Sequence, residues 1–231
     1  MQQFLWVIYP YLTLSLMVWG SLWRYDLDPL GWGSRSSEVL EKRWLKWGSL
    51  LFHWGIILVF FGHVAGILVP KAVWSALGVS REFYHENADI AGGITGLMAW
   101  TGIGILILRR WRFPRVRINS RVMMDWVAIL LLFVVISLGL SITLLYNNMV
   151  GPYGYRSTVG PWIRGLLVLH PDPTLMAGVP LLIKIHILAA FTLFAISPFT
   201  RLVHIWSLPL AYLRRAPIQY RSRTQYRGRG A

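Results

Sequence analysis

Five long apolar segments alternate with short polar connections along the 231-residue chain. At about 1.5 Å of rise per residue, each segment is long enough to cross roughly 30 Å of hydrocarbon as an α-helix. The pattern therefore predicts an all-α integral membrane protein, a bundle of five transmembrane helices. The predicted helices occupy residues 4–23, 48–69, 88–108, 122–146 and 181–206.

The connections between these segments are too short to hold a second domain. We expect one transmembrane domain over residues 1–213 and a basic cytoplasmic tail over residues 214–231. The longest connection, residues 147–180, contains five prolines and is predicted to be an ordered external loop with a short interfacial helix at residues 162–169. No basic residue precedes the first apolar segment, so this segment is predicted to persist as a helix rather than be cleaved as a signal peptide.

Composition and charge agree with a membrane location. Hydrophobic residues make up 55% of the chain and charged residues only 14%. The basic residues form short blocks between apolar runs, which argues against a nucleic-acid-binding surface. Of the 23 Lys and Arg residues, 18 fall in the first connection, the third connection and the C-terminal region, against five on the other side. This bias predicts an external N-terminus and a cytoplasmic C-terminus.

Four histidines lie within the predicted helices, where an imidazole is costly and usually functional. His53 and His63 belong to the second helix, and His186 and His204 belong to the fifth. Because these helices run in opposite directions, His63 meets His186 near the outside and His53 meets His204 near the cytoplasm. Facing pairs of neutral imidazoles are the axial ligands of b-type haems. The sequence therefore predicts an outer haem and an inner haem, with the four imidazoles as ligands of the haem iron.

The spacing of the histidines contains one mismatch. Ten residues separate His53 from His63, which is about 15 Å of helix and a rotation of roughly 80°. Eighteen residues separate His186 from His204, which is about 27 Å and five whole turns. Tilted helices and tilted haem planes would have to absorb this difference. The chain has no cysteine, which excludes covalently attached haem and thiolate-ligated iron–sulfur clusters.

Small and basic residues near the histidines each allow two interpretations. Gly55, Gly62 and Gly66 would let a flat macrocycle approach the backbone, but Gly-x-x-x-Gly spacing also serves helix packing. Arginines at the inner ends of the third and fifth helices could pair with haem propionates, or they could only mark the cytoplasmic boundary. These arginines are Arg109, Arg110, Arg112 and Arg201.

Several stretches of the chain resemble the respiratory nitrate reductase gamma subunit, a membrane dihaem cytochrome b. The second helix of that family is similar to residues 51–55 (LFHWG) and 61–70 (FGHVAGILVP). The resemblance continues, in order along nearly the whole chain, at residues 8–11 (IYPY), 24–26 (RYD), 114–117 (PRVR) and 198–207 (PFTRLVHIWS).

This resemblance implies a subunit in a bacterial or archaeal cytoplasmic membrane that anchors an iron–sulfur subunit and a molybdenum catalytic subunit on the cytoplasmic side. It would oxidise quinol near the outer surface and pass electrons inward through two b haems. The four haem ligands of the family match His53, His63, His186 and His204. Candidates for the quinol site are Gly62, His63, Lys71, Tyr84 and His85.

The chain departs from the family pattern next to the third helix. The family can place a lysine there, whereas alignment on residues 91–93 puts Tyr84 at that position, beside His85. This departure implies a different quinol, a different proton route or an altered affinity. We expect His85 to act as the external base because imidazole titrates near neutral pH.

Other classes of function remain open from the sequence. One is a cytochrome b anchor of another molybdenum or iron–sulfur complex, such as a nitrite oxidoreductase or a reductase of disulfides or sulfur compounds. A transporter would typically show internal repeats and broken helices, which we do not find convincingly. A passive anchor would leave the four paired histidines unexplained. No hydrolytic triad or phosphate-binding loop occurs in the chain, so the predicted chemistry is redox.

Overall fold

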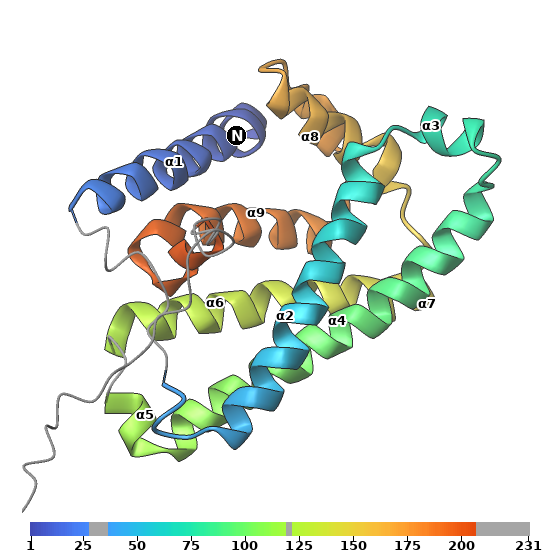
Figure 1. The fold of residues 1–231 in the computed structure, drawn as a ribbon. Helices are drawn as coiled ribbons and strands as arrows, with labels where there is room; N and C mark the ends of the chain where they lie inside the picture. The colour runs from blue at the N-terminus through green and yellow to red at the C-terminus, as the bar shows by residue number, and fades with distance from the viewer. Residues whose placement is uncertain (28–36, 119–121, 207–231) are drawn as a thin grey trace, which may run out of the picture.

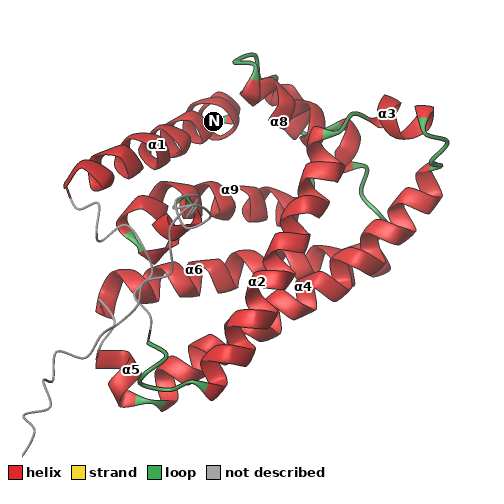
Figure 2. Cartoon of the chain, in the orientation of Figure 1, coloured by secondary structure: helices red, strands yellow, loops and turns green. Residues whose placement is uncertain are grey.

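The computed structural model describes residues 1–27, 37–118 and 122–206, and all regular elements within these residues are helical (Figures 1 and 2). The tail predicted over residues 214–231 lies outside this part of the chain. Five helical segments are long and apolar enough to cross a membrane, which confirms the predicted number of spans. These segments are Phe4–Leu27, Arg43–Leu68, Arg81–Arg112, Met124–Met149 and Leu181–Phe199.

Three of the spans contain a π-helical turn. The elements of the first half are η1 (Phe4–Ile8), α1 (Tyr9–Leu27), α2 (Arg43–His63), η3 (Val64–Leu68), α3 (Lys71–Ala76), α4 (Arg81–Arg112) and α5 (Pro114–Ile118). The elements of the second half are α6 (Val122–Ser141), η4 (Ile142–Tyr146), α7 (Asn147–Met149), η5 (Tyr155–Ser157), α8 (Val159–Leu167), η6 (Pro173–Met176), α9 (Leu181–Ile196), η7 (Ser197–Phe199) and η8 (Arg201–Ile205).

Glycines let α2 and α4 pack closely along their lengths (Figure 1). A Cβ atom at Gly55 of α2 would overlap the backbone of Ala99, and a Cβ atom at Gly102 of α4 would overlap the backbone of Phe52. Close approach of this kind is typical of helix pairs in membranes. For Gly55, the structure therefore supports helix packing rather than approach to a macrocycle. The main neighbours of α9 are instead α1 and α6.

A second core joins α1, α8 and α9. Trp162 of α8 is completely buried, and its indole Nε1 donates a hydrogen bond of 2.8 Å to the carbonyl oxygen of Trp6. The Trp162 ring also contacts the rings of Trp6 and Phe191 edge to face. Helix α8 confirms a short helix near residues 162–169, although it begins three residues earlier, and its place at the membrane interface stays a prediction. It closes one end of the bundle over α1 and α9.

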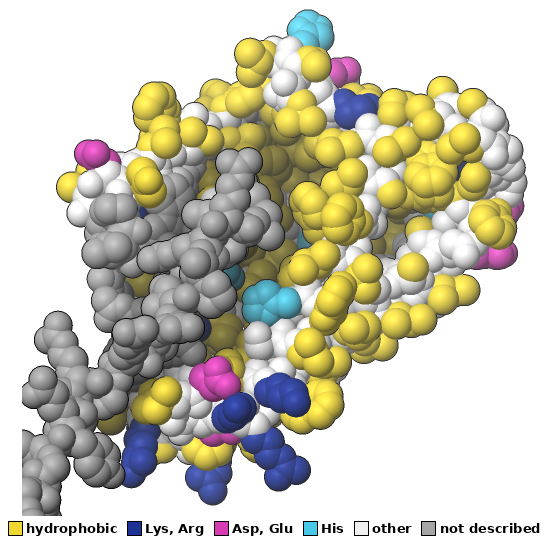
Figure 3. Space-filling view, viewed as in Figure 1, with side chains coloured by type: hydrophobic (Ala, Val, Ile, Leu, Met, Phe, Trp, Pro, Cys, Tyr) yellow, Lys and Arg dark blue, Asp and Glu magenta, His cyan; other side chains and the backbone are white. Residues whose placement is uncertain are grey.

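The outer surface of the spans is apolar. Large side chains such as Trp19 and Phe60 are 70% and 61% exposed, far more than a soluble protein would tolerate across a whole bundle. In the view of Figure 3, Lys and Arg side chains gather at the end that contains α5 and the start of α2. This uneven distribution matches the predicted charge bias, and the orientation of the termini remains a prediction from it.

Candidate functional site

Both predicted histidine pairs come together between α2 and the last span. The ring centres of His63 and His186 lie 6.3 Å apart, and their planes differ by 25°. The ring centres of His53 and His204 also lie 6.3 Å apart, with planes at 63°. The antiparallel directions of the two spans therefore match the histidines in depth as the sequence predicted.

This separation fits two imidazoles that share one metal ion. A metal–nitrogen bond of about 2 Å, plus about 1.1 Å from that nitrogen to the ring centre, gives about 6 Å between ring centres on opposite sides of the metal. In Figure 3, histidine side chains border a hollow lined by hydrophobic side chains. His53 and His63 are exposed side chains on α2. The donor set and its surroundings fit b haem.

Hydrogen bonds orient all four imidazoles in the same way. Each Nδ1 faces a backbone carbonyl oxygen, which can only accept, so Nδ1 carries the proton and Nε2 keeps its lone pair. A second ring nitrogen held by such a bond is typical of metal-binding histidines. The acceptors are Val59 for His63 (2.8 Å), Ser49 for His53 (2.8 Å), Val135 for His186 (3.1 Å) and Arg201 for His204.

The last span is broken, and the prediction of one continuous helix over residues 181–206 was wrong. The α-helix ends at Ile196, two residues before Pro198, and Thr200 is extended, with φ −123° and ψ −179°. Proline lacks an amide hydrogen and so cannot continue the hydrogen-bond ladder of the α-helix, and the extended backbone at Thr200 follows two residues after Pro198. His204 consequently belongs to a separate 3-10 turn. The break, and not tilt alone, accommodates the unequal histidine spacing.

Arg24 of α1 holds this break in place. Its guanidinium Nη1 donates hydrogen bonds of 2.6 Å to the carbonyl oxygens of Pro198 and Thr200, the residues on either side of Phe199. The same arginine lies in the RYD stretch at residues 24–26. The first span thus positions the turn that carries His204.

The glycines near the histidines have different surroundings. A Cβ atom at Gly139 of α6 would lie 3.0 Å from His186 Cε1, so Gly139 makes room for that imidazole. A Cβ atom at Gly62 would meet nothing within 4 Å. At Gly66 it would lie 2.6 Å from the Tyr155 hydroxyl and 3.0 Å from the Tyr84 hydroxyl. Gly139 was missed by the sequence analysis because it lies on a helix without a histidine.

Two of the four candidate arginines flank a buried carboxylate close to His204. Arg110 Nη2 lies 4.0 Å from Asp125 Oδ2, and Arg201 Nε lies 3.5 Å from Asp125 Oδ1. Arg110 Nη1 is buried and has no hydrogen-bond partner in the protein. A group in this state can accept a further anionic partner such as a carboxylate.

The other two candidate arginines differ from this pair. Arg109 Nε donates a 2.7 Å hydrogen bond to Glu41 Oε2, and its guanidinium also binds Ser37 and the Glu41 carbonyl oxygen. Its described contacts therefore tie the segment before α2 to α4. Arg112 is exposed.

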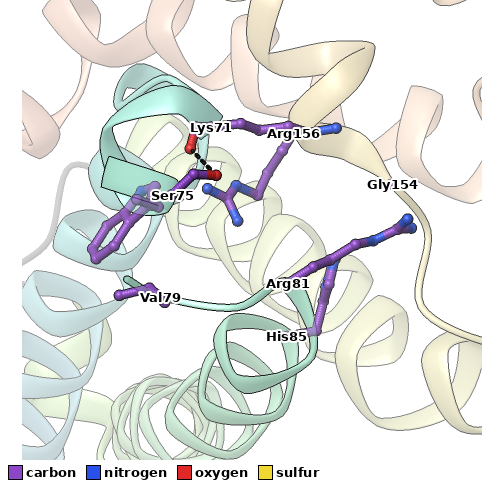
Figure 4. A pocket seen from close by; sticks show the side chains of 8 residues that line it. Lys71, Ser75, Val79, Arg81, His85, Gly154 and Arg156 are labelled. Carbon is purple, nitrogen blue, oxygen red and sulfur yellow. Dashed lines mark hydrogen bonds between the residues drawn. The ribbon is translucent and has the colours of Figure 1, made fainter. Parts of the chain in front are cut away.

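The structure divides the five quinol-site candidates into separate groups. Gly62 and His63 lie on α2, whereas Lys71 and His85 line a small cavity at the same end of the bundle, shown in Figure 4. Tyr84 is buried beneath that cavity, and its ring stacks against the Arg156 guanidinium at 3.8 Å.

Tyr84 and His85 belong to a helix and not to a loop, which corrects the sequence-based expectation. Helix α4 begins at Arg81 because the Ser80 hydroxyl caps it, accepting a hydrogen bond of 3.1 Å from the Phe83 amide. The polar residues of this first turn lowered the local hydropathy, so the sequence pattern started the helix only at residue 88.

The partly buried Tyr155 and the buried Arg156 are residues that the sequence analysis did not single out. Burial, followed by the neighbouring Tyr84, raises the pKa of Tyr155 well above its ordinary value, so its hydroxyl stays protonated. Arg156 is 6% exposed. Both residues lie in the irregular connection between α7 and α8, where neither periodicity nor composition indicates burial.

Comparison with known proteins gives a consistent picture. The family model described as nitrate reductase gamma subunit matches residues 2–223. The chain is 45% identical over 222 residues to the nitrate reductase gamma chain of Bacillus subtilis, covering 96% of this chain and 99% of that one. It is 34% identical over 218 residues to the respiratory nitrate reductase 1 gamma chain of Escherichia coli, covering 93% and 95%. It is also 41% identical over 230 residues to the nitrate reductase-like protein NarX of Mycobacterium tuberculosis, covering 97% of this chain and 34% of that protein.

Proposed function

Because the chain belongs to the nitrate reductase gamma subunit family, we propose that it is the quinol-oxidising cytochrome b subunit of a respiratory nitrate reductase. As a family member with five membrane spans, it is a multi-pass protein of the bacterial inner membrane and a subunit of an oxidoreductase complex. The family match confirms the resemblance derived from the sequence.

The two histidine pairs support the assignment of two b haems. His63 and His186 would hold the outer haem, and His53 and His204 would hold the inner one. When bound, the haems supply one-electron transfer between quinol and the partner subunits. The carbonyl-bound Nδ1 atoms keep each ring oriented and keep each Nε2 free to bind iron.

Arginines at the inner end of the bundle would neutralise haem carboxylates. Arg110 and Arg201 are the favoured propionate partners, because both lie beside Asp125 and the Arg201 carbonyl orients His204. Arg112 is a less favoured propionate partner because its side chain is exposed. Arg109 is the weakest candidate because Glu41 and Ser37 already occupy it.

Quinol oxidation would occur at the end of the bundle that holds His63. Quinol loses two electrons and two protons on conversion to quinone, so the site needs a proton acceptor that connects to the outside. His85 lies near this end, on the first turns of α4, beside the Tyr84 and Tyr155 rings. Gly62 leaves open space next to His63, into which a flat ring could enter. Lys71 is the remaining candidate for contact with quinol.

The electrons would leave at the basic end of the bundle. There the subunit would bind the cytoplasmic iron–sulfur subunit, which in turn would contact the molybdenum catalytic subunit. Exposed cations of α4 and α5 at this end, including Arg112 and Arg115, provide a surface for an acidic partner. Protons released outside and electrons delivered inside would together generate a membrane potential.

This proposal rests on the two histidine pairs, each with 6.3 Å between the ring centres. A haem assay tests it. A pyridine haemochrome assay and a reduced-minus-oxidised spectrum of the intact complex should give two b haems per chain. Replacing His186 with alanine should remove one haem, and replacing His53 with alanine should remove the other. His170, an exposed loop histidine, is the matched control, and His170→Ala should retain both haems. Loss of the same haem in His186→Ala and His53→Ala would show that the pairing is wrong.

A further inference from the structure

A cationic cavity lies at the end of the bundle opposite the basic α4–α5 turn. It has a volume of about 90 Å³ and lies between α3, the first turns of α4 and the segment before α8 (Figure 4). Lys71, Arg81 and Arg156 line it, together with His85. No carboxylate is among its lining residues in the described chain, although Glu82 and Glu86 line an adjacent cavity on the far side of Arg81 and His85.

Arg156 is the buried member of this group. The residue is 6% exposed, and its Nε and Nη2 atoms have no hydrogen-bond partner in the protein. The face of the guanidinium rests on the Tyr84 ring, which leaves its edge to the cavity. Buried guanidinium nitrogens that lack hydrogen-bond partners are unfavourable, so native proteins usually pair them. An anion in the cavity would supply that partner.

The surroundings of the cavity indicate an amphiphilic anion. Val73 and Leu77, on α3 and directly after it, expose apolar side chains next to the cations, at 45% and 69% exposure. Cations beside exposed apolar side chains at the end of membrane spans are typical of lipid headgroup contacts. The amino-terminal turn of α4 also borders the cavity, and its dipole favours negative charge.

We propose that this cavity binds the phosphate group of a phospholipid, with Arg156, Lys71 and Arg81 as its ligands. The volume is sufficient for one tetrahedral phosphate, and three guanidinium or ammonium groups exceed the single charge of a phosphodiester. The site therefore prefers a lipid with net negative charge over a zwitterionic one. The inference concerns a lipid site and does not depend on the proposed electron transfer.

The test is lipid binding to the full-length chain in its complex, purified in detergent and freed of endogenous lipid. Phosphatidylglycerol and phosphatidylcholine are titrated separately and bound lipid is counted by native mass spectrometry. The unaltered protein should retain one phosphatidylglycerol at this site with higher affinity than phosphatidylcholine. The double variant Lys71→Gln/Arg81→Gln should bind phosphatidylglycerol at least about tenfold more weakly, since each charge-assisted contact contributes roughly this factor.

A matched control and a second variant keep the test decisive. Lys184 is a cation at the same end that binds the Ala177 carbonyl and does not line the cavity, so Lys184→Gln should bind lipid like the unaltered protein. Lys71 and Arg81 are exposed, so their replacement should preserve folding, which circular dichroism checks. Arg156→Gln should show the largest loss of binding if it folds.

Three results would overturn the proposal. Equal phosphatidylglycerol affinity in the double variant and in Lys184→Gln would show that the cavity does not bind the lipid. Binding of inorganic phosphate without any lipid selectivity, measured by phosphorus-31 line broadening, would assign the cavity to free phosphate instead. Displacement of bound lipid by a water-soluble quinol analogue, which carries no phosphate, would assign it to quinol.

Discussion

At the scale of single residues, Gly139 gives the sharpest test of how the outer histidine pair is positioned. A Cβ atom there would lie 3.0 Å from His186 Cε1, tighter than a normal contact. Because the carbonyl of Val135, which lies on α6 like Gly139, holds His186 of α9, the ring cannot shift without losing its orientation. We expect Gly139→Ala to shift or remove the outer haem signal and to leave the inner one unchanged, as measured by low-temperature optical spectra.

A matched glycine separates this effect from general loss of helix packing. A Cβ atom at Gly104 of α4 would meet nothing within 4 Å, so Gly104→Ala should keep both haem signals. Equal spectra for Gly139→Ala and the unaltered protein would contradict the role given to Gly139.

The sequence identified the paired histidines but not the residues that position them. Antiparallel spans fix which histidines share a depth, so His63 with His186 and His53 with His204 followed from topology. The Val135 carbonyl that holds His186, and the space at Gly139, depend on how α6 packs on α9, which no local pattern records. Arg156 was visible only as one more external cation.

At the scale of elements, Glu41 joins the start of α2 to the end of α4. Its carboxylate accepts hydrogen bonds from the amides of Trp44 and Leu45 in the first turn of α2, and from Arg109 Nε at 2.7 Å. Burial raises the pKa of Glu41, but these hydrogen bonds outweigh burial and hold the pKa below its ordinary value. The ionised form is therefore the stabilising one.

The depressed pKa sets the pH at which this stabilisation acts. A lowered folded-state pKa contributes stability above the unfolded pKa, and that contribution disappears as the pH falls through the lower folded value. We expect Glu41→Gln to destabilise the protein by about 1–3 kcal/mol at pH 7. As the pH falls from the ordinary carboxyl pKa of about 4.5 through the lower folded value, the stabilities of the variant and the parent should converge, as followed by thermal unfolding in detergent.

Glu38 provides the comparison for this prediction. It forms a 3.5 Å ion pair with Lys42, and both side chains are more than half exposed, so Glu38→Gln should change stability little at any pH. A pH-independent effect of Glu41→Gln would show that lost packing, and not the ionised carboxylate, is responsible.

The elements themselves were predicted unevenly. Long apolar runs gave all five spans, because hydrocarbon thickness sets their minimum length. The predicted ends of the helices were less accurate where polar residues extend a helix beyond its apolar segment, as at the start of α4. The break after Ile196 was missed although Pro198 marks it, since hydropathy continues across the proline.

At the scale of the whole molecule, the charge bias predicts the orientation of every span. A reporter that is active only in the cytoplasm should be active when fused at Arg112 and inactive when fused at Arg156, and a reporter that is active only outside should give the opposite result. Arg223 should also lie inside, although it belongs to the tail outside the described residues. A cytoplasmic signal at Arg156 would show that the bundle has the opposite orientation, with the proposed quinol site on the cytoplasmic face of the membrane.

The last prediction concerns electron transfer through the intact complex. In His186→Ala the outer pair is lost while His53 and His204 keep their contact, so quinol should no longer reduce the chain. In His204→Ala the outer pair remains, so quinol should still reduce the chain, but nitrate reduction driven by quinol should stop. An artificial donor that feeds the partner subunits directly should restore nitrate reduction in both variants, because their catalytic centre is unchanged. Haem spectra, quinol-driven haem reduction and artificial-donor activity are therefore measured on the same two preparations. If His204→Ala supported quinol-driven nitrate reduction at the parental rate, electrons would have to leave the subunit without passing the inner pair, and the proposed direction of transfer would be wrong.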